Sequence, residues 1–205
     1  MSKINKIFIL LLFAFVPSLA MADDHGDGKM AMNGYFYVGA EYQKIDVSYG
    51  TLNGVPLSTY YEEDLDAFAG YVGYRFNDNI GVELSYANSS EGEKNNVLGT
   101  GVNVTNSFDL TAVEAMLFLP VDSEKKFDII GAIGLARVSA EAKASNATAN
   151  VRVDDSENKM RFGIGAQYEI VENVRIRAML RHQEADFSGD LDDAKIYSIG
   201  LNFSF

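Results

Sequence analysis

The sequence contains no cysteine, only two histidines and, beyond residue 16, no apolar run approaching the 18 or more residues of a membrane helix. The absence of cysteine fits an oxidising compartment, because no free thiol is left to mispair. It also excludes a cysteine metal cluster, and the sequence has neither a glycine-rich phosphate loop nor a histidine and glutamate metal motif. A net charge of −12 opposes binding to nucleic acid.

The N-terminus has the composition of an export signal. Lys3 and Lys6 precede the apolar run from Ile7 to Val16, and small residues follow in Ala20-Met21-Ala22. This order predicts a signal peptide over residues 1–22, cleaved after Ala22. An uncleaved anchor is the alternative, but ten helical residues span only about 15 Å, half of the hydrocarbon core. Residues 23–33 would then be a short periplasmic tail and residues 34–205 one domain.

From Gly34 onward, apolar residues recur at every second position, which is the side-chain alternation of β-strands. One face of these stretches contains no ionisable side chain except tyrosine. The sequence therefore predicts an all-β fold of about eight strands. The stretches cover residues 35–47, 67–76, 80–90, 108–119, 127–138, 160–170, 174–182 and 194–205.

Alternation alone does not decide which face is inside, because a soluble lipocalin-like barrel has the same period with its apolar face inward. The connections favour the opposite arrangement. Short connections at 77–79, 120–126 and 171–173 alternate with long ones such as 139–159. In an up-and-down barrel this places the short turns at one end and the long loops at the other, as in outer-membrane barrels.

The second face of the stretches carries charged residues and glycines. If this face lines a narrow lumen, each unpaired ion would cost several kcal/mol, so we predict an interior charge network. Such a network can plug the lumen or line an ion pathway, and the filled interiors of eight-stranded barrels favour the plug. The predicted members are Glu41, Arg75, Glu83, Glu114, Arg161, Glu169, Arg175, Arg177 and Arg181, with Gly39, Gly73, Gly81, Gly163, Gly165 and Gly200 as the small neighbours that arginines need.

Several motifs resemble those of the small outer-membrane β-barrel family, which includes the transmembrane domain of OmpA, OmpX-like proteins and opacity-type adhesins. They are Tyr37-Val38-Gly39-Ala40, Gly73-Tyr74-Arg75-Phe76, Gly81-Val82-Glu83-Leu84-Ser85-Tyr86 and the last strand, with Tyr197, Ile199, Leu201, Phe203 and Phe205. The resemblance implies an antiparallel up-and-down transmembrane β-barrel in the Gram-negative cell outer membrane. It also implies that the last strand is the signal for the barrel assembly machinery.

The same resemblance bears on the interior. Glu83 matches the inward carboxylate of the third strand in OmpA-like barrels, but Glu41 stands where a basic residue is expected in the first strand. The salt-bridge arrangement of the family therefore cannot be transferred to this chain.

A search for catalytic residues finds little. His182 has Glu184, Asp186 and Ser188 nearby, but four residues in one loop lack a scaffold to orient a nucleophile and its base. His25 lies among aspartates in a polar leader. We therefore expect no enzyme activity, no cofactor and no metal site.

The predicted loops contain 14 acidic and four basic residues. This surface could bridge lipopolysaccharide phosphates through divalent cations or only keep the loops solvated. Apolar residues in the first loop (Leu52, Val55, Leu57, Tyr60, Tyr61) and the third (Ala147, Ala149, Val151, Val153) could extend strands or form patches for a surface or host ligand. The sequence thus favours a non-enzymatic barrel acting in envelope integrity or adhesion, ahead of a narrow porin-like channel and a soluble carrier.

Overall fold

The structure is a computed structural model that describes residues 34–205, apart from 53, 98, 147–149 and 185–190. The predicted signal peptide and tail, residues 1–33, lie outside the described residues, as do His25, Ala147, Ala149, Asp186 and Ser188. Within the described part of the chain, no helix is long and apolar enough to cross a membrane.

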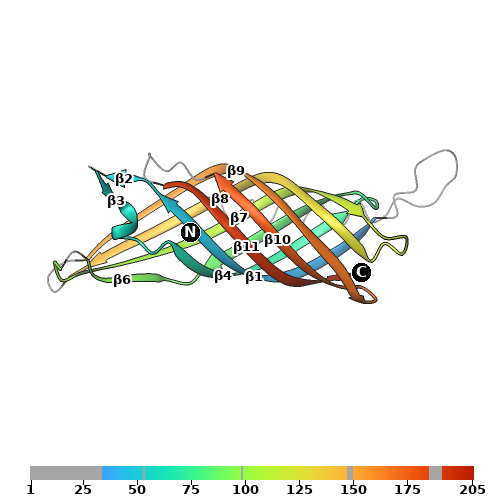
Figure 1. The fold of residues 1–205 in the computed structure, drawn as a ribbon, viewed down its shortest axis with the longest axis horizontal. Helices are drawn as coiled ribbons and strands as arrows, with labels where there is room; N and C mark the ends of the chain where they lie inside the picture. The colour runs from blue at the N-terminus through green and yellow to red at the C-terminus, as the bar shows by residue number, and fades with distance from the viewer. Residues whose placement is uncertain (1–33, 53, 98, 147–149, 185–190) are drawn as a thin grey trace, which may run out of the picture. The chain divides into compact units, whose positions relative to one another are not determined.

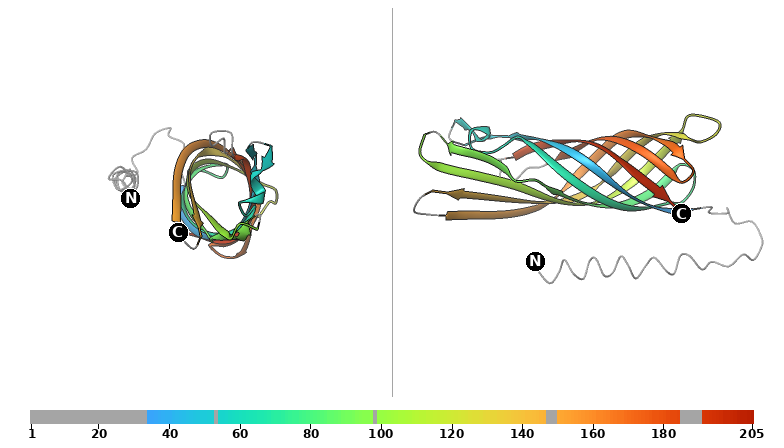
Figure 2. Two further views of the ribbon diagram at one scale, coloured as in Figure 1. Left: turned by 90° about the vertical axis from the view of Figure 1, so that its left-hand side faces the viewer. Right: turned by 90° about the horizontal axis from the view of Figure 1, so that it is seen from below.

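Eight long strands form a closed antiparallel barrel (Figure 1). They are β1 (Tyr35–Tyr49), β4 (Asp64–Arg75), β5 (Ile80–Ser89), β7 (Val102–Pro120), β8 (Phe127–Ser145), β9 (Asn150–Val171), β10 (Val174–Glu184) and β11 (Leu191–Ser204). Each strand pairs with the next along the chain, and β1 also pairs with β11, from Tyr37 opposite Ser204 to Val47 opposite Ala194. The end-on view in Figure 2 shows the resulting ring. The predicted all-β, up-and-down barrel is confirmed.

The two ends of the barrel differ. Residues 76–79, 121–126 and 172–173 make short turns at the end where β1 begins and β11 finishes. Asp122 shapes one of these turns by accepting hydrogen bonds from the backbone N–H groups of Phe127 and Lys126, which lowers the pKa of its carboxyl. The opposite end carries the long connections, with β2 (Thr51–Leu52), β3 (Val55–Pro56), the 3-10 helix η1 (Leu57–Thr59) and β6 (Gly92–Val97).

The strands at the long-loop end extend further than the sequence predicted. β7 begins at Val102 instead of residue 108, and the predicted connection 139–159 is largely a hairpin of β8 and β9, paired from Ser139 opposite Ser156 to Ser145 opposite Asn150. One face of this hairpin pairs Ala142 with Val153 and Ala144 with Val151, so Val151 and Val153 do extend a strand, as their alternation in the sequence suggested. In the first loop Leu57 is buried, so it does not contribute to an exposed apolar patch.

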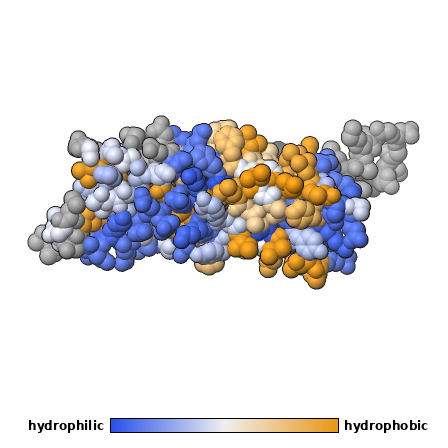
Figure 3. Space-filling view, viewed as in Figure 1, coloured by the Kyte–Doolittle hydropathy of each residue, from blue (hydrophilic) through white to orange (hydrophobic). Residues whose placement is uncertain are grey.

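The two faces of each strand near the short-turn end are chemically distinct. Large apolar side chains point outward, and Leu201 and Phe203 each keep about half of their surface exposed (51% and 48%). On the face seen in Figure 3, a hydrophobic band lies between hydrophilic regions. Tyr197, Ile199 and Phe205 of the predicted assembly signal are also outward and exposed. This arrangement matches a barrel surrounded by lipid, with charged residues turned into the lumen.

Tryptophan substitution tests this orientation, since the chain has no native tryptophan. We expect brominated acyl chains to quench Leu201→Trp and Phe203→Trp strongly, but Phe118→Trp much more weakly, because Phe118 faces the lumen and is only 1% exposed. The measurement is fluorescence quenching in lipid vesicles. Equal quenching at Phe118 and Leu201 would mean that the faces are wrongly assigned.

Candidate functional site

The candidate site is the lumen, where the structure brings six of the nine predicted charged residues into one cluster. Arg177 on β10 is at its centre: its Nη2 lies 2.5 Å from Glu41 Oε1 on β1, and its Nη1 lies 2.6 Å from Glu83 Oε2 on β5. All three side chains are at most 1% exposed. Charge-assisted contacts this short are the strong kind, so Arg177 joins β10 to β1, two strands away, and to β5 on the far side of the lumen.

Arg181, two inward positions further along β10, extends the cluster. Its Nη1 lies 3.0 Å from Glu41 Oε2, and its Nε lies 3.4 Å from Glu114 Oε2 on β7. Arg161 on β9 completes the cluster at 3.5 Å from Glu114 Oε1. Arg161 has no hydrogen bond to any described residue, so its contact with Glu114 is weaker than those of Arg177.

The remaining predicted residues lie nearer the short turns. Arg175 Nη2 pairs with Glu169 Oε2 at 2.5 Å. Arg75 Nη1 lies 2.8 Å from Asp128 Oδ2. The Tyr35 hydroxyl accepts hydrogen bonds from both Arg75 and Arg175, each at 3.2 Å, and so links the two pairs.

Asp128 is the charged residue that sequence analysis missed. It is fully buried, and besides Arg75 it accepts a hydrogen bond of 2.8 Å from Gln167 Nε2. The sequence could have indicated this inward position, because Asp128 precedes outward Ile129 at the start of a predicted strand. With Asp128 the set holds five carboxylates (41, 83, 114, 128, 169) and five guanidinium groups (75, 161, 175, 177, 181), so it is neutral as a whole.

Two of the six predicted lumen glycines make room for tyrosines. Gly73 lies opposite Tyr37, and Gly39 lies opposite Tyr71 on the neighbouring strand. A Cβ on either glycine would come within 2.2 Å of the facing tyrosine ring. The expectation that such glycines make room for arginine holds more directly at Gly163, where a Cβ would lie 3.1 Å from Arg181 Cγ.

Toward the long loops the lumen is mainly apolar, and the predicted charged residues are absent from this part of the described inner face. A buried cluster there contains Ile45, Val47, Leu65, Ala67, Ala69, Ala87, Phe108, Leu110, Ala112, Ala136, Val138, Ala194 and Ile196. At the same level the outward positions carry charge, for example Lys44, Asp66 and Lys195, which are exposed or partly exposed. The barrel therefore has two segments. Near the short turns the outer wall is apolar, and the lumen holds the ion pairs together with a second buried cluster of Tyr37, Tyr71, Met116, Phe118, Ile130, Ala132 and Met179. Near the long loops the outer wall carries charge and the lumen is mainly apolar.

The residues considered for catalysis do not form a site in the described part of the chain. His182 is exposed, and its Nδ1 lies 3.6 Å from Asp193 Oδ2. No group of three or more described histidine or acidic side chains is placed to hold a metal ion.

Comparison with known proteins agrees with this geometry. The family described as outer membrane protein beta-barrel domain matches residues 7–205. The chain belongs to this family. It is therefore a protein of the cell outer membrane. In barrels of this kind the short turns lie on the periplasmic side and the long loops on the extracellular side. Among curated proteins, none matches the sequence.

Solved structures show the same fold at low sequence identity. The attachment invasion locus protein Ail of Yersinia pestis, in complex with the heparin analogue sucrose octasulfate, is 15% identical, with 84% of this chain and 97% of that chain covered and a TM-score of 0.54. OprG of Pseudomonas aeruginosa is 12% identical, with 84% and 96% covered and a TM-score of 0.57. The N-terminal barrel domain of Pseudomonas aeruginosa OprF is 18% identical, with 84% and 100% covered and a TM-score of 0.51.

The geometry predicts that replacing either of two lumen arginines lowers the free energy of unfolding, but by different amounts. Arg177→Met leaves Glu41 and Glu83 buried without their closest partner, so we expect a loss of about 3–5 kcal/mol in the free energy of unfolding. Arg161→Met removes only longer contacts and should cost clearly less. Urea unfolding in lipid vesicles measures both. Equal losses for the two variants would contradict the central role of Arg177.

Proposed function

We propose that this protein is a closed, non-enzymatic barrel that contributes to envelope integrity and meets its partners at the extracellular surface. The observation that supports this most directly is the filled lumen. The ion-pair cluster occupies its membrane-embedded part, and the apolar cluster around Phe108 and Ile196 occupies its extracellular part. A lumen cavity lined by Tyr37, Arg75 and Phe118 measures about 10 Å³, close to the space of one water molecule.

The alternative of a narrow channel for ions or small solutes is less favoured by this packing. A conducting path needs water-filled space along the barrel, whereas eight-stranded interiors are just wide enough for side chains. In this protein, water would also have to enter the apolar cluster toward the long loops, where Ile45, Leu65 and Ile196 are buried. A soluble carrier is not compatible with the outer-membrane family.

The extracellular hairpin of β8 and β9 is the part that we assign to adhesion. Backbone pairing holds this hairpin, and it carries surface ion pairs: Lys143 contacts Glu141 at 2.7 Å and Glu91 at 3.2 Å, and Arg152 contacts Glu141 at 2.6 Å. Hydrogen bonds from Lys143 to Glu141 and Glu91 raise the pKa of this lysine. Val151 and Val153 remain about 60% exposed beside these charges.

The charge of this surface limits its partners. Ail was solved with a highly sulfated sugar, but the predicted loops of this chain carry 14 acidic against four basic residues. Such a surface would repel a polyanion, so we propose a host or surface ligand that is neutral or cationic. The proposed envelope partners are lipopolysaccharide, whose phosphates divalent cations would bridge to the acidic loops, and the barrel assembly machinery, which would recognise Tyr197, Ile199, Leu201, Phe203 and Phe205.

A hairpin truncation separates the two proposed roles. Replacing residues 141–154 by Asn-Gly joins Ala140 to Asp155, which lie opposite each other, through a two-residue turn. In a deletion strain, we expect this variant to restore detergent resistance as well as the full-length protein does, but not attachment to immobilised matrix protein.

The control is a variant with Glu141→Gln and Asp154→Asn, which keeps the hairpin and alters its charge. Surface levels and heat-dependent gel migration are compared for all three proteins. Full attachment by the truncated protein would rule out the hairpin as the adhesive element.

A further inference from the structure

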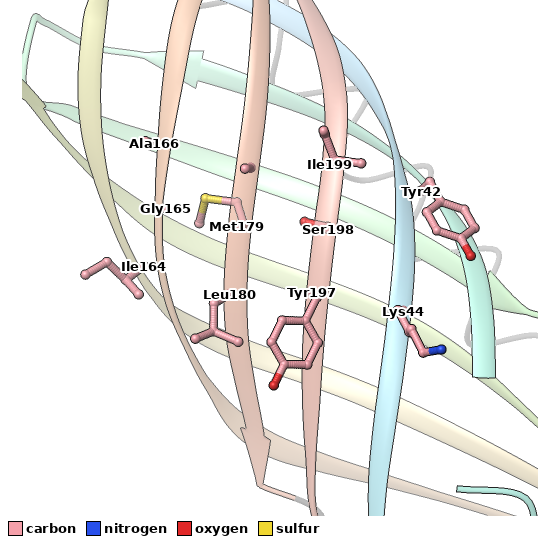
Figure 4. Close-up of a pocket in the computed structure, with 11 residues that line it drawn as sticks. Tyr42, Lys44, Ile164, Gly165, Ala166, Met179, Leu180, Tyr197, Ser198 and Ile199 are labelled. Carbon is pink, nitrogen blue, oxygen red and sulfur yellow. The ribbon is translucent and has the colours of Figure 1, made fainter. Parts of the chain in front are cut away.

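The extracellular hairpin leaves one backbone edge of β9 without a described partner. In the wall of the barrel β9 pairs on both sides, and Ile164 lies opposite Leu180 on β10 and Gly131 on β8. Figure 4 shows Ile164 and Leu180 on these neighbouring strands. The pairing with β10 ends at Arg161, whereas the pairing with β8 continues without a register shift to Asn150.

Residues 150–157 therefore form a free edge among the residues that the structure describes. Along a strand, the backbone groups of successive residues point to opposite sides, so half of these residues direct their N–H and C=O groups away from β8. The connection between Glu184 and Leu191 has six residues, which cannot run beside all of residues 150–157 and return. Unpaired backbone groups of this kind are a template for another strand.

The other edge of the same extracellular sheet is protected. It is formed by β6, which is only six residues long and shifts its register against β7 between Lys94 and Val97. Short length and irregular pairing are two means by which exposed edges avoid joining other strands. Residues 150–157 pair regularly with β8 and contain neither proline nor glycine. The edge of β9 thus lacks these obstacles to strand addition.

The side chains along this edge define the chemistry of an added strand. Val151, Val153 and Asp155 alternate on the face that continues the lumen wall, because they lie at even spacing from inward Arg161. Both valines are exposed. Asp155 accepts a hydrogen bond of 2.7 Å from the N–H of Ser156, but it forms no ion pair with a described residue. An added strand therefore meets two apolar side chains and one carboxylate without a counter-ion.

We propose that residues 150–157 bind an extended segment of a partner protein, which joins the sheet as an antiparallel strand. Apolar side chains of this segment pack beside Val151 and Val153, and a basic side chain lies beside Asp155. Backbone hydrogen bonds supply the affinity, and these three positions supply the selectivity. The inference rests on the proposed adhesion by the hairpin and names the kind of ligand that the hairpin binds.

The probe is the synthetic peptide Thr-Lys-Thr-Val-Thr-Val-Thr with blocked ends. As an antiparallel strand it places its lysine opposite Asp155 and its valines opposite Val153 and Val151. It is titrated against the full-length protein in detergent, and hydrogen/deuterium exchange is followed along β9. We expect every second amide of residues 150–157 to exchange more slowly when the peptide is bound, because the other amides are already paired with β8.

Two N-methylated versions of the peptide test backbone pairing. One carries N-methyl groups on the odd residues and the other on the even residues. Only one edge of the peptide faces β9, so one version should bind as the unmodified peptide does. The other loses its hydrogen bonds to β9, and we expect at least about tenfold weaker binding.

Asp155→Asn and Asp154→Asn are the matched variants. They remove the same charge from neighbouring residues on opposite faces of the strand. We expect Asp155→Asn to bind the peptide about two- to fivefold more weakly, since an exposed ion pair contributes modestly, and Asp154→Asn to bind it unchanged. Heat-dependent migration on a gel verifies that both variants are folded.

Four results would overturn the proposal. They are equal binding of the two methylated peptides, equal binding by the two variants, slower exchange only outside residues 150–157, and absence of binding at about 1 mM peptide. Slower exchange of the edge at high protein concentration without peptide would instead assign it to a second copy of this chain. Attachment by the truncated hairpin variant would reject adhesion, whereas lost attachment without peptide binding would reject strand addition alone.

Discussion

Every strand of this barrel passes from hydrocarbon into water, and that change of medium determines what its two faces can carry. In the bilayer the outward face must be apolar, so the charged residues lie in the lumen, where Arg177 holds Glu41 and Glu83. Beyond the bilayer the outward face becomes charged and the lumen fills with apolar side chains around Phe108 and Ile196. The same ring of strands is thus a membrane barrel at one end and resembles a water-soluble barrel at the other.

This division has energetic consequences for the lumen. Charges buried inside a narrow barrel must be balanced, and the balance is reached only when Asp128 is included as the partner of Arg75. Close packing of the tyrosines depends in turn on Gly39 and Gly73, where any side chain would collide with a ring. The paired charges and the packed tyrosines both fill space that would otherwise hold water. Together they close the membrane-embedded part of the lumen.

Much of this arrangement could be predicted from the alternation of residues. The period of two placed Leu201 and Phe203 on one face and Glu41 and Arg177 on the other, because neighbouring residues of a strand point to opposite sides. The alternation of short and long connections then indicated that the apolar face is the outer one. Which arginine contacts which carboxylate could not be predicted, since it depends on the stagger between strands around the ring. The alternation of Val151 and Val153 indicated a strand extension, but the full length of the hairpin of β8 and β9 could not be predicted, because most of its other positions are charged or small. The inward position of Asp128 could have been predicted, because it precedes outward Ile129 in the same alternating stretch.

The claim that the lumen is filled by paired charges and an apolar cluster is tested most directly by conductance in planar bilayers. The folded protein, inserted at a density verified by heat-dependent gel migration, should leave the current in 1 M KCl at the level of the protein-free membrane. A sixteen-stranded porin in the same bilayer serves as the positive control. Reproducible unit steps from the unchanged protein would contradict the account, because ions cannot cross a lumen in which Arg177 and Ile196 are both packed against their neighbours.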